Sequence, residues 1–458
     1  MNSVLLGVLG YIGLQLAIGA WVSRRVATEK DYINAGRRLG PVIGAFSVFA
    51  TWFGAEAIVG TAGQVYERGL TGAEVDPFGY ALALCIGGLL FAAVLWRRGL
   101  TTFADFFRAR YGAGVEKLVV IVLLPGSIFW AAAQIRAFGQ VVSSISDIGV
   151  PLAITGAAVA VAAYTVLGGL LADAVTDFVQ GIAIIIGLGV LALLAAGELG
   201  GVAQSLAAVP ADRLNPGEGN PLELAERYAV PICGTIVAVE LVSRMLGCRS
   251  AEVARTATVS GGILYLAVGL FPVYLGLVGP EIAAGLVGDE VEQVVPHLAE
   301  KLMPGFLFVL FAGALVSAIL STVDSVLLAS AAQVSHNIVM RLRPGASERV
   351  KLLSARLTVV AMAVVACVLA LTAESIRDLV EVASAAGSPG LLVCLLFGLR
   401  SQFGGPLSAA AAIIAGTAVW LAGYVGGFTE TPYLAALAAA LGAYVLGALG
   451  TAPPTRAP

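Results

Sequence analysis

The sequence predicts an all-α polytopic membrane protein of about 13 transmembrane helices, and three observations support this prediction. Of 458 residues, 59% are hydrophobic and only 12% are charged, and the mean hydropathy is +0.94. Such a chain has too little polar surface to cover a soluble globule. The apolar residues form segments long enough to cross a bilayer as helices, and basic residues recur in alternate loops between these segments.

Apolar segments account for most of the chain. They fall near residues 2–23, 41–66, 76–96, 117–144, 149–171, 175–197, 227–247, 257–280, 304–338, 352–373, 377–398, 404–424 and 431–450. We therefore expect a single transmembrane domain over residues 1–458. We expect residues 1–30 to form an extra helix that is retained, because Met1 to Trp21 carry no charge and Arg24 and Arg25 follow them. A secretory signal peptide places its positive charges first.

Alternation of basic residues between loops predicts the orientation, because cytoplasmic loops near membrane ends accumulate Lys and Arg. The loops expected inside contain Arg24, Arg25, Lys30, Arg37 and Arg38; Arg97, Arg98, Arg108, Arg110 and Lys117; Arg244, Arg249 and Arg255; and Arg341, Arg343, Arg349, Lys351 and Arg356. The loops expected outside contain mainly Glu67, Glu74, Asp76, Glu218, Glu223, Glu226, Glu281, Asp289, Glu290 and Glu292. We therefore expect a protein of a cell membrane of the bacterial inner-membrane type, with the N-terminus outside and the C-terminus in the cytoplasm.

Composition also argues against several functional classes. The five cysteines show no CxxC spacing, and His297 and His336 lie far apart in the sequence, so we expect no disulfide framework or metal centre. The net charge of −3 gives no reason to expect a nucleic-acid partner. No catalytic dyad or metal set is visible, so we expect no catalytic residues and no enzyme.

Five ionisable residues fall inside the apolar segments: Glu56, Arg136, Asp177, Glu240 and Asp324. An ionisable side chain inside a membrane costs at least a few kcal/mol, so each requires a partner, a water-filled cavity or a function. The alternative for any one of them is a structural ion pair or a position at a membrane end.

Two of these acids suggest an internal repeat. Glu56 lies in the second apolar segment and Glu240 in the seventh, so the two segments are five helices apart. An odd offset turns the second copy upside down in the membrane, which is the inverted-repeat plan that places binding sites on paired broken helices near the midplane. We expect a first repeat at 41–197, a second at 226–398 and two trailing helices at 404–450.

The ninth segment concentrates side-chain oxygens, which Ser317, Ser321, Thr322, Asp324 and Ser325 supply within two helical turns. Oxygen ligands suit a hard cation. Hydroxyls in membrane helices also bond back to their own backbone carbonyls, which is the alternative for any single serine. Asp177, near the start of the sixth segment, is a further oxygen donor.

Four motifs resemble those of the sodium:solute symporter family, over residues 30 to 400. They are "GRRLGP" (36–41), "ATWFGAEAIVGTAG" (50–63), "YTVLGGLLADAVTDFVQ" (164–180) and "SAILSTVDSVLLAS" (317–330). The resemblance implies a five-plus-five inverted repeat of the LeuT-like kind and Na+ as the coupling ion. It also implies that the domain over residues 1–458 is a transporter.

The family's shared sodium site uses backbone carbonyls of the first core helix with carbonyl and hydroxyl oxygens of the eighth. By resemblance, the ligands here are Ala50, Phe53, Ala318, Ser321 and Thr322. Some members bind a second sodium, and the similar residues here are Asp177 and Ser325, with Asp324 where choline carriers also have an acid.

Local sequence is most similar to the choline carriers of the family. Trp52, Tyr80 and Trp130 resemble their aromatic cage, which holds a quaternary ammonium by cation–π attraction. Packing or interfacial aromatics are the alternative. The chain departs from these carriers at Ala238, where they have Trp, and at Glu240, where they have another aromatic residue.

The acids Glu56 and Glu240 favour a substrate with a primary or secondary ammonium, such as a polyamine or a basic amino acid. Alternatively, Glu56 pairs with Arg136 and Glu240 with Arg244, which would remove this preference. We expect a bilayer-embedded symporter that carries sodium and a small organic solute by alternating access, the solute being choline or another amine. The alternatives are a sodium- or proton-coupled amino acid carrier of the proline type and, more remotely, a membrane sensor module.

Overall fold

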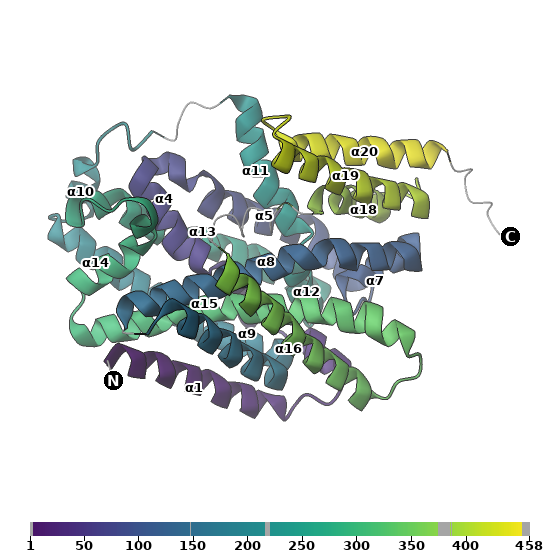
Figure 1. Cartoon of the computed structure of the whole chain (residues 1–458), viewed down its shortest axis with the longest axis horizontal. Coiled ribbons are helices and arrows are strands. Elements are labelled where there is room, and N and C mark those ends of the chain that lie inside the picture. Colours follow the sequence, from purple (N-terminus) through teal and green to yellow (C-terminus); the bar gives the residue numbers. More distant parts are fainter. Residues whose placement is uncertain (1–2, 147, 216–219, 374–384, 386, 451–458) are drawn as a thin grey trace.

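The computed structural model describes residues 3–146, 148–215, 220–373, 385 and 387–450. Within these ranges the chain is built of helices without a β-strand, apart from one isolated bridge between Leu39 and Cys248. The all-α prediction is therefore confirmed. Figure 1 shows the helices, with α18, α19 and α20 grouped along one edge and α1 along the opposite edge.

The α-helices are α1 (Ser3–Ser23), α2 (Glu29–Asn34), α3 (Pro41–Trp52), α4 (Thr61–Arg68), α5 (Tyr80–Ile86), α6 (Ala93–Arg97), α7 (Phe103–Tyr111), α8 (Ala113–Ile145), α9 (Val150–Glu198), α10 (Val202–Ala208), α11 (Pro221–Ile236), α12 (Val239–Gly247), α13 (Ala251–Ile282), α14 (Val294–Leu302), α15 (Gly305–Val334), α16 (Glu348–Thr372), α18 (Ser388–Arg400), α19 (Pro406–Gly426) and α20 (Pro432–Leu449). The segments η2 (Glu56–Gly60), η4 (Glu74–Gly79), η5 (Gly87–Ala92) and η7 (Ser335–Val339) have π-helical hydrogen bonding. The segments η1 (Ala35–Arg37), η3 (Gly69–Ala73), η6 (Gly288–Gln293) and η8 (Met340–Leu342) are 3₁₀-helical.

Each of the apolar segments found in the sequence overlaps a helix. In the described residues, 8 continuous helices are long and apolar enough to cross a membrane, or up to 10 when each of two bent pairs is taken as one span. Two shorter apolar helices, Leu9–Ser23 and Ser388–Arg400, add to these. The start of the expected span 377–398 lies outside the described residues.

Helix α9 accounts for two of the expected spans. Its 49 residues would extend about 74 Å as one straight helix, which is more than twice the thickness of a bilayer core. The helix is broken at Gly169, where φ is +58°. A Cβ at this position would lie 2.5 Å from the carbonyl oxygen of Tyr32, so only glycine allows α2 to pack into the break.

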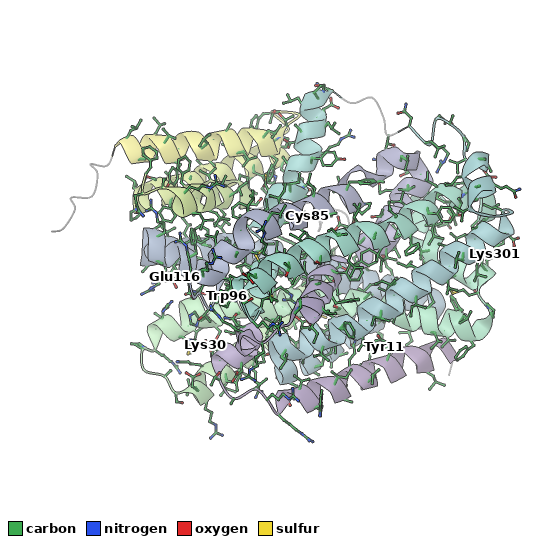
Figure 2. All side chains as sticks on the ribbon, turned by 180° about the vertical axis from the view of Figure 1, so that it is seen from behind. Tyr11, Lys30, Cys85, Trp96, Glu116 and Lys301 are labelled. Atoms are coloured by element: carbon green, nitrogen blue, oxygen red, sulfur yellow. The ribbon has the colours of Figure 1, made fainter. Side chains whose placement is uncertain are left out.

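The loops with basic residues gather at one end of the molecule. The backbone N–H of Glu29 donates to Glu348 (3.1 Å), and that of Arg249 donates to the carbonyl oxygen of Leu39 (3.0 Å). In Figure 2, Lys30 and Glu116 lie toward this end, whereas Lys301 lies at the opposite end. These contacts join loops that are expected on the same side of the membrane.

The loops expected on the other side also contact one another. Arg213 donates to the carbonyl oxygen of Val65 (2.9 Å), and the backbone N–H of Tyr433 donates to Glu226 (2.6 Å). The tertiary structure therefore sorts the loops into the same two groups as the charge pattern.

Candidate substrate and sodium site

The first functional element is a break in the span that begins with α3. This helix ends at Trp52, Phe53 leaves the helical conformation with ψ of 62°, and the axis turns by 64° before η2 and α4. A Cβ at Gly54 would lie 2.6 Å from both Gln134 Oε1 and Thr322 Oγ1, so glycine allows two polar side chains to approach the break. Gln134 Oε1 accepts from the backbone N–H of Ala55 (2.8 Å) and satisfies one group that the break releases.

A second broken span lies opposite the first. Helices α11 and α12 meet at an angle of 43°, and Ala238 between them is extended, with φ of −66° and ψ of 130°. Interrupted helices of this kind are tolerated in a membrane only where their backbone is buried in protein or lines a cavity. Such pairs form the binding sites of many transporters.

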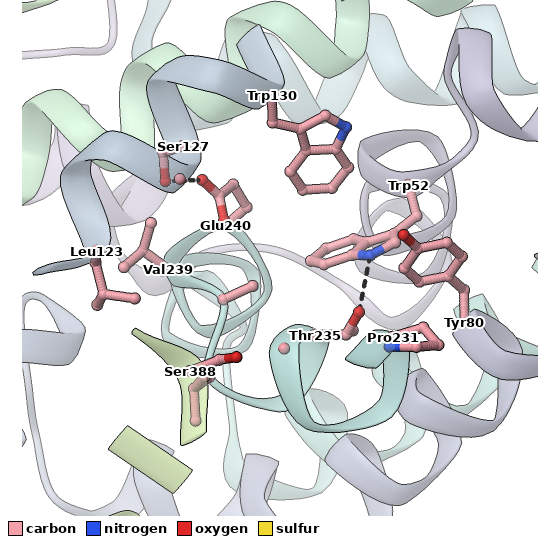
Figure 3. A pocket seen from close by; sticks show the side chains of 14 residues that line it. Trp52, Tyr80, Leu123, Ser127, Trp130, Pro231, Thr235, Val239, Glu240 and Ser388 are labelled. Atoms are coloured by element: carbon pink, nitrogen blue, oxygen red, sulfur yellow. Dashed lines mark hydrogen bonds between the residues drawn. The ribbon is translucent and has the colours of Figure 1, made fainter. Parts of the chain in front are cut away.

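A cavity of about 540 Å³, including the space at its mouth, lies between these elements. Its polar and aromatic lining consists of Trp52, Tyr80, Ser127, Trp130, Thr235, Glu240 and Ser388. Figure 3 shows these side chains around the pocket. Four of the five expected substrate residues therefore share one cavity. The fifth, Glu56, does not line it but accepts a hydrogen bond from the hydroxyl of Tyr80 (3.3 Å).

Two indoles form one wall of the cavity. The ring centroids of Trp52 and Trp130 are 5.6 Å apart with an interplanar angle of 65°. Trp52 Nε1 donates to Thr235 Oγ1 (3.3 Å), which fixes that ring. Trp130 Nε1 is buried and has no hydrogen-bond partner among the described residues. A pair of edge-to-face indoles offers the π surface that attracts an organic cation.

Glu240 is the carboxylate of the cavity. It is 2% exposed, and its Oε1 accepts from Ser127 Oγ (2.8 Å). Glu240 forms no ion pair with Arg244 within 4 Å in the described residues, because Arg244 forms its ion pair with Asp173, although the charge of Arg244 still acts on Glu240 from a longer distance. The geometry of a helix allows the four-residue pair, but the fully buried guanidinium of Arg244 points to a carboxylate on α9 instead.

The alternative pairing of Glu56 with Arg136 is also wrong for the described structure. Glu56 bonds to Tyr80, and Arg136 donates to the carbonyl oxygen of Ala370 (3.2 Å). Both candidate substrate acids therefore lack an ion pair within the part of the chain that the structure describes.

The expected sodium ligands meet beside the break in α3. Thr322 Oγ1 lies 3.3 Å from the carbonyl oxygen of Ala50 and 3.5 Å from that of Ala318. Phe53 occupies the break itself. Ser321, on the same face of α15, donates to Asp177. The structure therefore brings two carbonyl oxygens and the Thr322 hydroxyl together beside the break, which is an oxygen set suited to a hard cation, whereas the Ser321 hydroxyl is bonded to Asp177.

The residues expected at a second sodium site form a connected polar cluster. Asp177 accepts from Ser47 (2.8 Å) and from Ser321. Ser325 lies 3.2 Å from Asp173 Oδ1 and accepts from Arg244. All of these side chains are buried.

Asp324 adds a third carboxylate to this cluster, and its Oδ1 is buried without a hydrogen-bond partner among the described residues. Sequence reasoning missed Asp173 and Arg244. Asp173 lies one helical turn before Asp177 and could have been found by that spacing. Arg244 lies near the end of an apolar segment, so the charge pattern assigned it to a loop.

A family model that describes the sodium:solute symporter family matches residues 32–416 of the chain. The chain belongs to the sodium:solute symporter family. The "High-affinity choline transporter 1" of Caenorhabditis elegans is 28% identical to this symporter over 410 residues, which cover 80% of this chain and 68% of that protein. The osmoregulated proline transporter OpuE of Bacillus subtilis is 27% identical over 445 residues, which cover 90% of this chain and 87% of that protein.

The fold of this symporter is that of a known transporter structure. It superposes with a TM-score of 0.89 on a Na+-coupled sialic acid symporter in a substrate-bound outward-open state, at 17% identity over 99% of this chain and 98% of the other. Membership of the family confirms the expectations of a transporter rather than an enzyme, of a multi-pass membrane location, and of sodium and a small solute as the transported species.

Proposed function

We propose that this symporter uses a sodium gradient to carry a small organic cation, an amine or quaternary ammonium such as choline. The observation that supports the proposal is the cavity between the broken spans, which combines the facing indoles of Trp52 and Trp130 with the carboxylate of Glu240. Aromatic faces and a buried carboxylate both favour positive charge. The name of the C. elegans relative agrees with this class of solute.

A zwitterion such as proline is the second candidate, and the relation to OpuE favours it. Its carboxylate would have to bind away from Glu240, because two negative charges repel in a cavity of low dielectric. Among the described residues that line the cavity there is no Lys or Arg to receive that carboxylate. We therefore rank the cation first.

We propose that sodium binds between Ala50, Phe53, Ala318, Ser321 and Thr322, where α15 meets the break in α3. An ion there would hold the break in the conformation that presents Trp52 to the cavity, because Ala50 and Trp52 lie on the same last turn of α3. Sodium and solute would then strengthen each other's binding by a coupling free energy of about 1 to 3 kcal/mol. A second sodium among Asp177, Asp324 and Ser325 is part of the same proposal.

We propose that the segments 41–197 and 226–398 are the two repeats that rock about this site, and that the N-terminus is outside and the C-terminus inside. The sorting of loops supports this orientation, because the end that carries Glu29, Leu39, Arg249 and Glu348 is the one rich in basic residues.

Binding of labelled choline to the purified chain in sodium buffer tests the proposal. We expect saturable binding that Glu240→Gln weakens at least tenfold, because a charge-assisted contact contributes about 1.5 to 3 kcal/mol. Glu67→Gln is the matched control, because it removes the same charge from a residue of α4 that is exposed and lies outside the cavity. Binding of labelled proline but not choline would support the second candidate instead.

A further inference from the structure

Two further carboxylates lie behind one wall of the cavity, of which Asp76 is buried and Glu56 is half-buried. Glu56 is on η2 and Asp76 is on η4. Glu56 accepts from Tyr80 (3.3 Å), and Asp76 Oδ1 accepts from Tyr265 (2.8 Å). The ring centroids of these two tyrosines are 6.4 Å apart. The two acids therefore accept hydrogen bonds from neighbouring tyrosine side chains. The charge pattern of the sequence had placed Asp76 in an outer loop, but its side chain is 6% exposed.

No basic side chain of the described residues lies near Glu56 or Asp76, whereas the charge of Arg244 acts on Glu240 from beyond ion-pair distance. Asp76 Oδ2 is buried and has no hydrogen-bond partner among the described residues. Glu56, Asp76 and Glu240 accept hydrogen bonds from tyrosine or serine hydroxyls, and none forms an ion pair with a basic side chain of the described residues. Buried charges in proteins are normally paired. Binding of a cation would offset the cost of ionising these carboxylates in a buried site.

The two anionic groups lie on different sides of the aromatic wall. Figure 3 shows Glu240 on one side of the Trp52 indole and Tyr80 on the other. Tyr80 lines the cavity while its hydroxyl contacts Glu56. Glu56 and Asp76 do not line the cavity, so a solute that spans the indoles would contact Glu240 directly and would reach Glu56 and Asp76 only when the side chain of Tyr80 moves aside.

We propose that the substrate of this symporter is a short linear diamine. One ammonium binds Glu240, the carbon chain lies across Trp52 and Trp130, and the second ammonium binds at Glu56 and Asp76. This inference rests on the proposed transport of organic cations and narrows it, because a monovalent amine would leave the second anionic group unpaired. Apolar methylene groups between two charges suit an aromatic wall with a carboxylate at each end.

Competition binding tests the inference with labelled 1,4-diaminobutane as the probe on the purified full chain in sodium buffer. Unlabelled diamines of increasing chain length are compared with butylamine and choline. We expect one diamine length to displace the probe at least about tenfold better than butylamine, as one additional charge-assisted contact predicts. In Glu56→Gln the ratio between the affinities for the best diamine and for butylamine should fall toward one.

Asp76→Asn is a second variant in case Glu56→Gln does not fold, and Glu67→Gln is again the control of equal charge. If butylamine or choline binds as tightly as every diamine in the unmodified chain, the inference is wrong and the transport of organic cations stands. If Glu56→Gln and Asp76→Asn both keep the full diamine advantage, the second anionic group is not the binding site. If no amine binds at all, the inference and the proposed function are both wrong.

Discussion

Thr322 provides a direct test of the sodium site, because its hydroxyl lies 3.3 Å from the carbonyl oxygen of Ala50 and 3.5 Å from that of Ala318. We predict that Thr322→Val weakens sodium binding with little effect on folding, since valine has the same shape. The lost contact of a hydroxyl with a charged group is equivalent to about 1.5 to 3 kcal/mol, or roughly tenfold to a hundredfold in the dissociation constant.

The assay is thermal unfolding of the purified chain at increasing sodium and constant ionic strength, with potassium as the replacement. Binding to the folded state alone stabilises it by RT ln(1 + [Na+]/Kd), so the sodium concentration at which the melting temperature begins to rise reports Kd. Thr322→Ser retains the hydroxyl and should behave like the unmodified chain. An unchanged sodium response in Thr322→Val would refute the assignment of this residue as a ligand.

Three further predictions concern the buried ion pair, the break in α3 and the indole of Trp130. Arg244→Met should lower the free energy of unfolding by about 3 to 5 kcal/mol, because it leaves the charge of Asp173 buried without a partner. Adding Asp173→Asn to that variant should restore part of the lost free energy, which a double-mutant cycle measured by chemical unfolding would show. Gly54→Ala should abolish sodium-dependent uptake, because its Cβ would lie 2.6 Å from two side-chain oxygens. Trp130→Leu should raise the dissociation constant for choline by about two- to thirtyfold, as the loss of a cation–π contact of about 0.5 to 2 kcal/mol predicts.

Controls for these substitutions come from exposed positions. Gly10→Ala meets nothing within 4 Å, and Trp21 is 57% exposed on α1, so Gly10→Ala and Trp21→Leu should leave uptake and choline affinity unchanged. Full uptake in Gly54→Ala would mean that the break tolerates a side chain. If Trp130→Leu binds choline as tightly as the unmodified chain, the ring of Trp130 is not part of the binding site. If the losses of unfolding free energy from the Arg244 and Asp173 substitutions simply add, the two side chains are not coupled.

The architecture was predictable because it depends on local composition. Long apolar segments and the alternation of basic loops identify spans and sides of a membrane without any tertiary information. The break near Gly54 could be expected because the segment 50–63 is rich in glycine and alanine. The motif resemblance brought Ala50 and Thr322 together, although 272 residues separate them. Their role in binding sodium stays a prediction.

The partners of the buried charges could not be predicted. Helical spacing suggests partners only three or four residues away, but Glu240 bonds to Ser127, 113 residues earlier, and Arg244 bonds to Asp173, 71 residues earlier. The charge pattern counted Arg244 and Asp76 as loop residues because both lie near span ends. Tertiary packing buries both, and this burial places Arg244 against Asp173 and Asp76 against the hydroxyl of Tyr265.

The central claim is that a sodium gradient drives uptake of an organic cation, and the most direct measurement is uptake into proteoliposomes that contain the purified chain. Labelled choline and labelled 1,4-diaminobutane are supplied outside, with an inward gradient of sodium or of potassium. We predict that at least one of them accumulates above its equilibrium level with sodium and not with potassium. Accumulation of proline alone, or uptake of the cations that is indifferent to sodium, would contradict the account.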